Sequence, residues 1–216
     1  MIGATEGTVD DCVRLAPREM AEGRGFTDPA HTARDLVVVG LMLAAIRRAV
    51  TAGPGLPVGP RSLVLEPPGL DGRAHRAIVC DERRLGDGRD LTWVGFFAVK
   101  RRDRDSTPLT VMDDELITEF PAHPGILSYI SLELADEDWG NLILLDGDAA
   151  REQWRDGERH AYAARELAPR NYTNVRLHQG VLPGGVRAGL EPILRRTKYY
   201  DYRAGATWRA ERELPA

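Results

Sequence analysis

Hydrophobic and polar positions follow the clearest pattern between residues 139 and 181. Residues 141–145 are an apolar run that ends at Asp146-Gly147-Asp148, a turn whose aspartates can cap a helix. At 100° per residue, small side chains and a single tryptophan then fall in one narrow stripe of a helix over residues 148–168. That stripe consists of Ala150, Trp154, Gly157, Ala161 and Ala164. The pattern predicts a strand, then a helix that packs closely on a sheet.

A second strand follows Pro169, which ends the helix. From residue 173 onward, Asn174, Arg176 and His178 alternate with Val175 and Leu177. If the valine and leucine contact the helix, the three polar side chains line the opposite face of the sheet. Two interpretations stay open: this polar face is exposed to solvent, or it lines a site.

The preceding segment completes a compact unit. Residues 92–99 are apolar on both faces, which is typical of a central strand, and residues 112–120 form a short amphipathic helix. Residues 126–134 and 139–145 are two further strands joined by a tight acidic turn. The order is strand, helix, strand, strand, helix, strand, so an α+β, ferredoxin-like βαββαβ domain is predicted for residues 91–185.

Three other segments surround this domain. Residues 1–60 are a helical N-terminal extension, with a buried helix that starts near Pro29 and includes the apolar run 36–46. Residues 61–90 contribute connecting strands, and residues 186–216 are an aromatic C-terminal tail. The alternative for residues 36–90 is a degenerate second ferredoxin-like unit.

Composition limits the function classes. A net charge of −4 and a pI near 5.8 argue against a general nucleic-acid binder and against a polybasic membrane anchor, which leaves small molecules or proteins as partners. The longest apolar run is about half of what a bilayer requires, so we expect a cytoplasmic protein. The two cysteines lie far apart and the loop histidines lack ligand-spaced carboxylates, so no metal site is predicted. The scarcity of lysine suggests a GC-rich bacterial genome.

A ferredoxin-like sheet has helices on one face only, and its other face is commonly buried by a second copy. Residues 91–181 resemble the antibiotic-biosynthesis monooxygenase type of dimeric α/β barrel. The resemblance lies in a strand that runs into a helix carrying Trp154 and the spaced His160, followed by a strand of alternating polar and apolar residues. It implies a homodimer with a cavity.

The resemblance also implies a range of chemistries, from cofactor-independent quinone-forming oxygenases to flavin-dependent relatives, haem-binding enzymes and plain binding proteins. Our first hypothesis is a bacterial natural-product tailoring oxygenase for an aromatic polyketide-like substrate. A base generates a carbanion that reacts with O2, and no cofactor is required, with reduced flavin as a second source of electrons. The alternatives are a haem-binding enzyme on the same fold and a non-catalytic ligand-binding or assembly protein.

Three residues are the catalytic candidates. Arg176 is the cation for a phenolate or enolate oxygen, and His178 beside it is the base or hydrogen-bond donor. His160 lies at the margin of the packing stripe, and it joins His178 as a candidate axial ligand if haem is bound. The competing interpretations are an exposed strand for Arg176 and His178 and a surface helical histidine for His160.

The substrate-binding candidates are three pairs of residues. Tyr129 and Glu133 share a face of their strand, and a two-fold partner would bring Glu133 to Arg176 in one cavity. Trp139 and Asn141 begin the neighbouring strand, and the amide is a donor for a carbonyl oxygen of a bound polycycle. Trp154 and Asn174 are the third pair. The predicted substrate-binding residues are therefore Tyr129, Glu133, Trp139, Asn141, Trp154 and Asn174.

Overall fold

The computed structural model describes residues 12–51, 61–63, 75–134 and 138–215. In this part of the chain one nine-stranded sheet has the order β1-β9-β8-β7-β4-β6-β5-β3-β2. The pairing of β1 with β9 is parallel, and all other neighbouring strands are antiparallel. The strands are β1 (Cys12–Arg14), β2 (Arg61–Leu63), β3 (His75–Val79), β4 (Leu91–Lys100), β5 (Ile126–Glu133), β6 (Trp139–Leu145), β7 (Tyr172–Leu182), β8 (Ile193–Asp201) and β9 (Trp208–Glu213).

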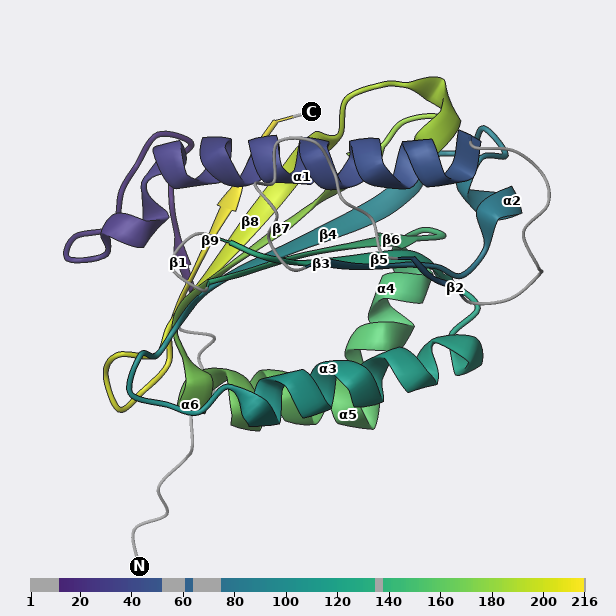
Figure 1. The fold of residues 1–216 in the computed structure, drawn as a ribbon. Coiled ribbons are helices and arrows are strands. Elements are labelled where there is room, and N and C mark those ends of the chain that lie inside the picture. Colours follow the sequence, from purple (N-terminus) through teal and green to yellow (C-terminus); the bar gives the residue numbers. More distant parts are fainter. Residues whose placement is uncertain (1–11, 52–60, 64–74, 135–137, 216) are drawn as a thin grey trace, which may run out of the picture.

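Helices cover both faces of the sheet. Figure 1 shows the long helix α1 on one face and α3, α4, α5 and α6 on the other. No helix in the described residues is long and apolar enough to cross a membrane. The helical elements are η1 (Gly25–Thr27), α1 (Pro29–Thr51), α2 (Glu82–Leu85), α3 (Thr107–Glu119), η2 (Phe120–Ala122), α4 (Asp148–Arg155), α5 (Glu158–Tyr162), the π-helical turn η4 (Ala163–Leu167), α6 (Ala168–Asn171) and η5 (Val186–Ala188).

The predicted ferredoxin-like unit is confirmed at the centre of this sheet. Its elements follow the chain as β4, α3, β5, β6, α4 to α6 and β7, and its strands lie in the order β7-β4-β6-β5. The helix predicted over 148–168 is interrupted, because α4 ends before Gly157 and α5 begins after it. A π-helical turn then follows at η4.

All four predicted segments contribute to the same sheet. The N-terminal segment adds β1, residues 61–90 add β2 and β3, and the aromatic tail adds β8 and β9. The alternative of a second ferredoxin-like unit is wrong for the described part of residues 36–90. Its strands β2 and β3 pair with each other at the edge of the one sheet, beside β5.

Helix α1 covers the face of the sheet that the sequence analysis assigned to a partner copy. Its inward stripe includes Val39, Met42, Leu43 and Ile46, all at most 1% exposed, and it packs on Trp93 and neighbouring strand residues. Burial of such side chains contributes about 1.5–3 kcal/mol each. The free face therefore finds its cover within the same chain. No second copy is needed to bury this face, so a homodimer stays a prediction without that support.

Candidate functional site

The polar residues of β7 lie under α1. In the sheet register His178 is opposite Gly95 of β4, and Arg176 is opposite Phe97, whose side chain belongs to the core against α1. Arg176 is 7% exposed and His178 is fully buried. The solvent-exposed interpretation of this face is therefore wrong for both residues.

A carboxylate from α1 holds both side chains. Arg176 donates to Asp35 through Nε (2.6 Å to Oδ2) and Nη2 (3.0 Å to Oδ1). His178 Nε2 lies 2.9 Å from Asp35 Oδ2, and its Nδ1 lies 2.9 Å from Thr197 Oγ1. A neutral imidazole satisfies both contacts if Nε2 donates to the carboxylate and Nδ1 accepts from the hydroxyl.

Burial and pairing set the charge states in this cluster. Burial lowers the pKa of His178 below its ordinary value, and this outweighs the opposing hydrogen bond and charge of Asp35. Burial by itself disfavours an ionised Asp35, but hydrogen bonds from His178 and Arg176 outweigh it and hold the pKa of Asp35 below its usual range. The cluster is therefore one buried Asp–Arg ion pair beside a neutral histidine.

The surroundings of His178 are filled by protein. The Phe97 ring lies 5.5 Å from the imidazole, centroid to centroid. Arg212, 2% exposed, donates to the hydroxyl of Tyr199 and to the carbonyl of Thr27. Because the described residues leave His178 fully buried and Arg176 only 7% exposed, the arrangement does not place them as base and cation of an open site.

The two polar rows do not meet in one cavity. Tyr129 is opposite Ile143, which is opposite Val94, whereas His178 shares its row with Ile130. Successive residues of a strand face opposite sides, so Tyr129 and Glu133 lie on the face covered by α3 to α6. Within the chain the sheet separates Glu133 from Arg176, and their meeting across a two-fold partner stays a prediction. Tyr129 donates to Asp113 of α3, which also pairs with Arg76.

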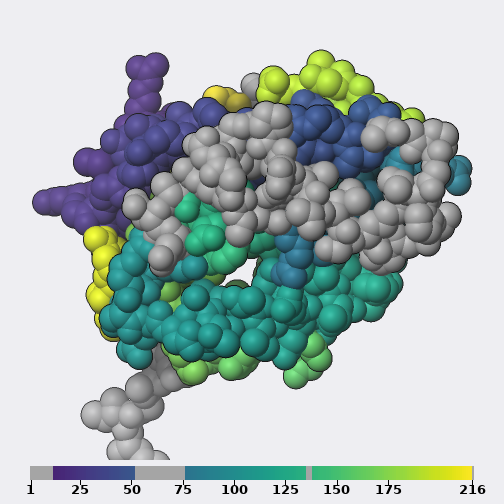
Figure 2. Space-filling view, in the orientation of Figure 1, coloured from purple at the N-terminus to yellow at the C-terminus, as the bar shows by residue number. Residues whose placement is uncertain are grey.

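On this second face, which we call the helix face, the helices do not close over the central strands. None of the 13 residues of α3 is buried. Val94, Phe96, Asn141, Ile143 and Leu177 all remain partly exposed, although they belong to the inner strands β4, β6 and β7. Figure 2 shows the surface hollowed between α3 and the sheet. The helix face therefore contains a hollow, whereas the face under α1 is packed.

The floor of this hollow is apolar with a few polar groups. Phe96 is opposite Asn141 in the register, and Trp139 is two residues before Asn141 on the same face. Lys100 Nζ lies 4.8 Å above the Trp139 ring centroid. The Asn141 Oδ1 atom is buried and has no hydrogen-bond partner in the described residues. An unpaired buried amide oxygen is costly, and a ligand hydroxyl would satisfy it.

Trp154 and His160 come together in the helix layer. Trp154 is 8% exposed and packs against Phe120 at 5.6 Å between ring centroids, and the His160 ring lies 5.4 Å from it. His160 Nδ1 is 3.3 Å from the backbone carbonyl of Arg155. Burial lowers the pKa of His160, so its imidazole is neutral near pH 7.

Asn174, the remaining candidate, lies on the α1 side of β7. It is 8% exposed, and its Nδ2 donates to Thr173 Oγ1 at 3.1 Å. Its Oδ1 atom has no hydrogen-bond partner among the described residues. The sheet separates it from Asn141, so the two amides do not share a cavity.

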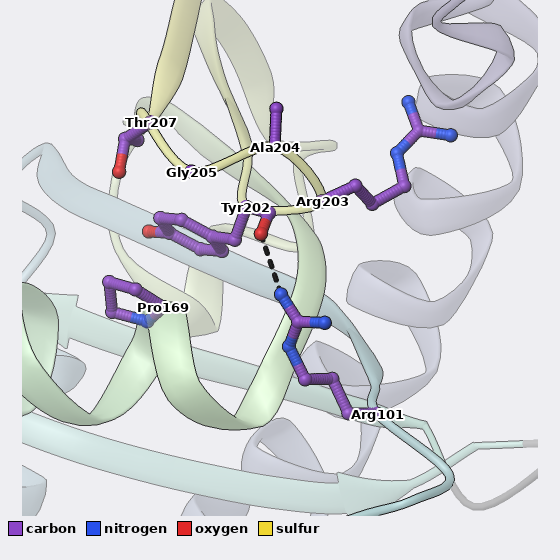
Figure 3. A pocket seen from close by; sticks show the side chains of 7 residues that line it. All are labelled: Arg101, Pro169, Tyr202, Arg203, Ala204, Gly205 and Thr207. Carbon is purple, nitrogen blue, oxygen red and sulfur yellow. Dashed lines mark hydrogen bonds between the residues drawn. The ribbon is translucent and has the colours of Figure 1, made fainter.

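A cavity of about 280 Å³ lies beside the turn between β8 and β9. Figure 3 shows the Tyr202 ring over Pro169 and the Arg101 guanidinium at the Tyr202 backbone carbonyl, which accepts its hydrogen bond at 2.6 Å. The Arg203 side chain points away, and it pairs with Asp201. Both charged residues of this shallow surface cavity already have partners, since Arg101 donates to the Tyr202 carbonyl and Arg203 pairs with Asp201. We therefore do not assign the function to this cavity.

Asp35 and Thr197 were not among the predicted site residues. Asp35 is the one carboxylate of α1 and lies directly before the apolar run 36–46, and a charge on the inward stripe of a buried helix signals a buried partner. Haem ligation by His178 does not fit, because both of its ring nitrogens have partners. No group of three or more histidine, cysteine, aspartate or glutamate side chains lies within metal-binding reach in the described part of the chain.

No protein-family model matches this chain, and no curated protein matches it. Among solved structures it is similar to SnoaB, a cofactor-independent oxygenase from Streptomyces nogalater, at 15% identity and TM-score 0.35, over 44% of this chain and 93% of that one. It is also similar to Rv0793 from Mycobacterium tuberculosis, at 22% identity and TM-score 0.36, over 43% of this chain and 92% of that one. The protein SO0527 from Shewanella oneidensis is similar at 14% identity and TM-score 0.37, over 44% and 94% of the two chains. At these scores the fold assignment rests on the strand order and register of the chain itself.

Proposed function

We propose that this protein is an oxygenase that binds a flat aromatic, polyketide-like substrate in the hollow of the helix face. The observation that carries the proposal is the exposure of inner-strand residues such as Phe96 and Ile143 beneath a helix with no buried residue. Ligand sites are typically apolar concavities with a few oriented polar groups. Asn141 supplies such a group, since its buried Oδ1 lacks a partner in the described residues.

The proposed chemistry needs a base, and His160 is our candidate. Burial keeps its imidazole neutral, and Nδ1–H donating to the Arg155 carbonyl leaves Nε2 as the acceptor. The base removes a proton from an acidic carbon of a phenol- or anthrone-type substrate. The carbanion then passes one electron to O2, and the resulting substrate radical and superoxide combine to form a C–O bond. The protonated peroxide loses water by cleavage of its O–O bond and of the second C–H bond, which leaves a carbonyl group on the substrate carbon. A substrate activated in this way requires no cofactor, and reduced flavin would be needed only for a less electron-rich ring.

Arg176 and His178 have a supporting role in this proposal. Their ion pair and hydrogen bond to Asp35 fix α1 against the sheet that forms the floor of the hollow. The substrate-binding group consists of the helix-face residues, and Asn174 is left out because it faces α1. The proposed binding residues are Tyr129, Glu133, Trp139, Asn141 and Trp154.

O2 uptake with a hydroxyanthrone substrate tests the proposal. We expect enzyme-dependent uptake, and Asn141→Ala should lower kcat/KM about 10-fold because one hydrogen bond of roughly 1.4 kcal/mol is lost. Asn174→Ala removes the same kind of side chain from the other face and should leave kcat/KM within about two-fold. Saturable binding of the hydroxyanthrone without any O2 uptake would instead favour a non-catalytic binding protein.

A further inference from the structure

A second cavity, of about 300 Å³, opens at the end of the sheet where α4 begins. Its charged lining comes from β8, β9 and α4, and Gln179 of β7 lies at its base. We call it the arginine pocket, after Arg151, Arg195 and Arg196. Nothing in the proposed oxygenase reaction uses these residues.

A β-bulge brings two neighbouring arginines to this one pocket. Gln179 pairs with Arg196 and Gly180 pairs with Leu194, so Arg195 is an extra residue in β8. Neighbours in a regular strand face opposite sides, but a bulge re-aims side chains and is often found beside functional sites. The bulge requires Gly180, because a Cβ there would lie 2.0 Å from the Ile193 carbonyl oxygen.

An amide contacts two of the three guanidinium groups, and it is the only side-chain hydrogen-bond partner of Arg196 among the described residues. Gln179 Oε1 accepts from Arg196 Nη2 at 2.6 Å and Nε at 3.1 Å, and from Arg151 Nη1 at 3.4 Å. An amide fixes these cations without neutralising them. The Arg195 side chain makes no hydrogen bond or ion pair with any residue in the described portion of the chain, and the backbone carbonyl of Arg195 accepts from the Leu214 N–H at 2.9 Å. Two cations of the pocket therefore lack a carboxylate partner.

The two carboxylates that line the pocket, Asp148 and Glu213, form no ion pair with Arg195 or Arg196. Asp148 lies 3.3 Å from Arg151 Nη1 and accepts a hydrogen bond from the Thr92 hydroxyl, so its partners are Arg151 and Thr92. Glu213 is directly opposite Arg196 in the register, but these two side chains form no ion pair. Glu152, just outside the lining, lies 3.8 Å from Arg151 Nη2, so Arg151 is balanced by two carboxylates. The unpaired positive charge of the pocket is therefore that of Arg195 and Arg196.

We propose that the arginine pocket binds the phosphate group of a small molecule. A phosphate carries about two negative charges and several acceptor oxygens, which suits guanidinium groups that approach from different elements. The first turn of α4 adds the positive end of an eight-residue helix at the same place. This inference does not depend on the aromatic substrate, because the pocket and the floor residues of the hollow are different sets.

Isothermal titration calorimetry of the full chain with inorganic phosphate at low ionic strength tests this inference. We expect saturable binding that Arg195→Gln and Arg196→Gln each weaken at least 10-fold. Arg170→Gln removes an exposed arginine of α6 outside the pocket and should change the affinity less than two-fold. Far-UV circular dichroism of each variant checks the fold.

A variant with the opposite expected effect guards against loss of folding. Glu213→Gln removes a negative charge from the pocket and should tighten phosphate binding several-fold. Acetate should bind at least 10-fold more weakly than phosphate. The inference is overturned if the native protein shows no saturable binding, if Arg170→Gln weakens it as much as Arg196→Gln does, or if acetate binds as tightly as phosphate.

Discussion

Asp35 of α1 and Arg176 of β7 form a two-bond ion pair in the interior of the protein, although 141 positions separate them in the chain. The side chain of each residue is less than 10% exposed. The pair joins the N-terminal helix to the last strand of the ferredoxin-like unit. Because the carboxylate satisfies the buried guanidinium, the polar face of β7 can lie in a packed core.

Loss of one member of this pair should destabilise the fold strongly. Asp35→Ala leaves the Arg176 cation buried without a partner, and we expect the free energy of unfolding to fall by about 3–5 kcal/mol. Urea unfolding measures the change. Glu166→Ala breaks the exposed pair with Arg170, and its effect should stay below about 1 kcal/mol. Similar effects for the two variants would contradict the role assigned to Asp35.

Acid should weaken the fold through His178. Its folded pKa is lowered, so below pH 6.5, its ordinary pKa, the unfolded chain takes up a proton that the folded chain does not. Stability is therefore lost as the pH falls from about 6.5, by at most about 1.4 kcal/mol per pH unit. The folded pKa of Asp35 is also lowered, so the stability that Asp35 contributes is present above pH 3.8, its ordinary pKa. This contribution is lost only as the pH falls below that value.

The comparison that isolates His178 is the free energy of unfolding against pH for the native protein and for His178→Gln. The variant should show a shallower decline between pH 6.5 and 5. Other histidines with lowered pKa, among them His31 and His160, are present in both proteins and cancel. Parallel curves would mean that His178 protonates equally in the folded and unfolded chains.

Gly180 should tolerate no side chain. A Cβ there would lie 2.0 Å from the Ile193 carbonyl oxygen and 2.6 Å from Trp93 Nε1, both fixed parts of the sheet and core. Gly180→Ala should lower Tm by more than about 5 °C, since overpacking costs roughly 1–3 kcal/mol or more. Gly205→Ala, with nothing within 4 Å of its Cβ, is the matched control. Calorimetric scans in which both variants melt alike would refute the packing argument.

Local periodicity predicted much of this fold because each element of the central unit has a clear pattern. The alternation from residue 173 onward gave the correct strand and the correct face for Val175 and Arg176. It could not tell what covers the polar face, because that cover, α1, is separated from β7 by more than 100 residues. The carboxylate of α1 meets the Arg176 cation and the neutral His178 only in the folded structure.

The tail shows a different limit. The sequence pattern over residues 186–216 predicts only an aromatic tail, and in β8 the bulge at Arg195 interrupts the alternation that marks a strand. The hollow also could not be predicted from the sequence. The sequence pattern predicts an amphipathic helix, but not that none of the residues of α3 is buried. Burial of a helix depends on where its neighbours place it, and α3 is linked to α5 by the ion pairs of Arg159 with Glu115 and Glu119.

His160 and His178 should respond differently in the enzyme assay. If His160 is the base, His160→Gln lowers kcat about 10²-fold, and the native rate rises with pH and levels off once its lowered pKa is passed. His178→Gln should change stability and leave kcat within a few-fold, since His178 lies under α1. Initial rates of O2 uptake between pH 5 and 8 provide the comparison. A pH profile unchanged in His160→Gln would remove that residue from the reaction.

The central claim is that ligand enters between α3 and the sheet, not beneath α1. Neighbouring residues of β6 test it directly: Ile143 is partly exposed on the helix face, and Leu142 is fully buried on the α1 face. In a chain with Cys12→Ser and Cys80→Ser, the maleimide labelling rates of Ile143→Cys and Leu142→Cys should be measured with and without hydroxyanthrone. The account predicts that the cysteine at 143 is labelled and that the ligand slows its labelling at least 10-fold, while the cysteine at 142 stays unreactive. Labelling at 142 that the ligand slows, or no labelling at 143, would contradict it.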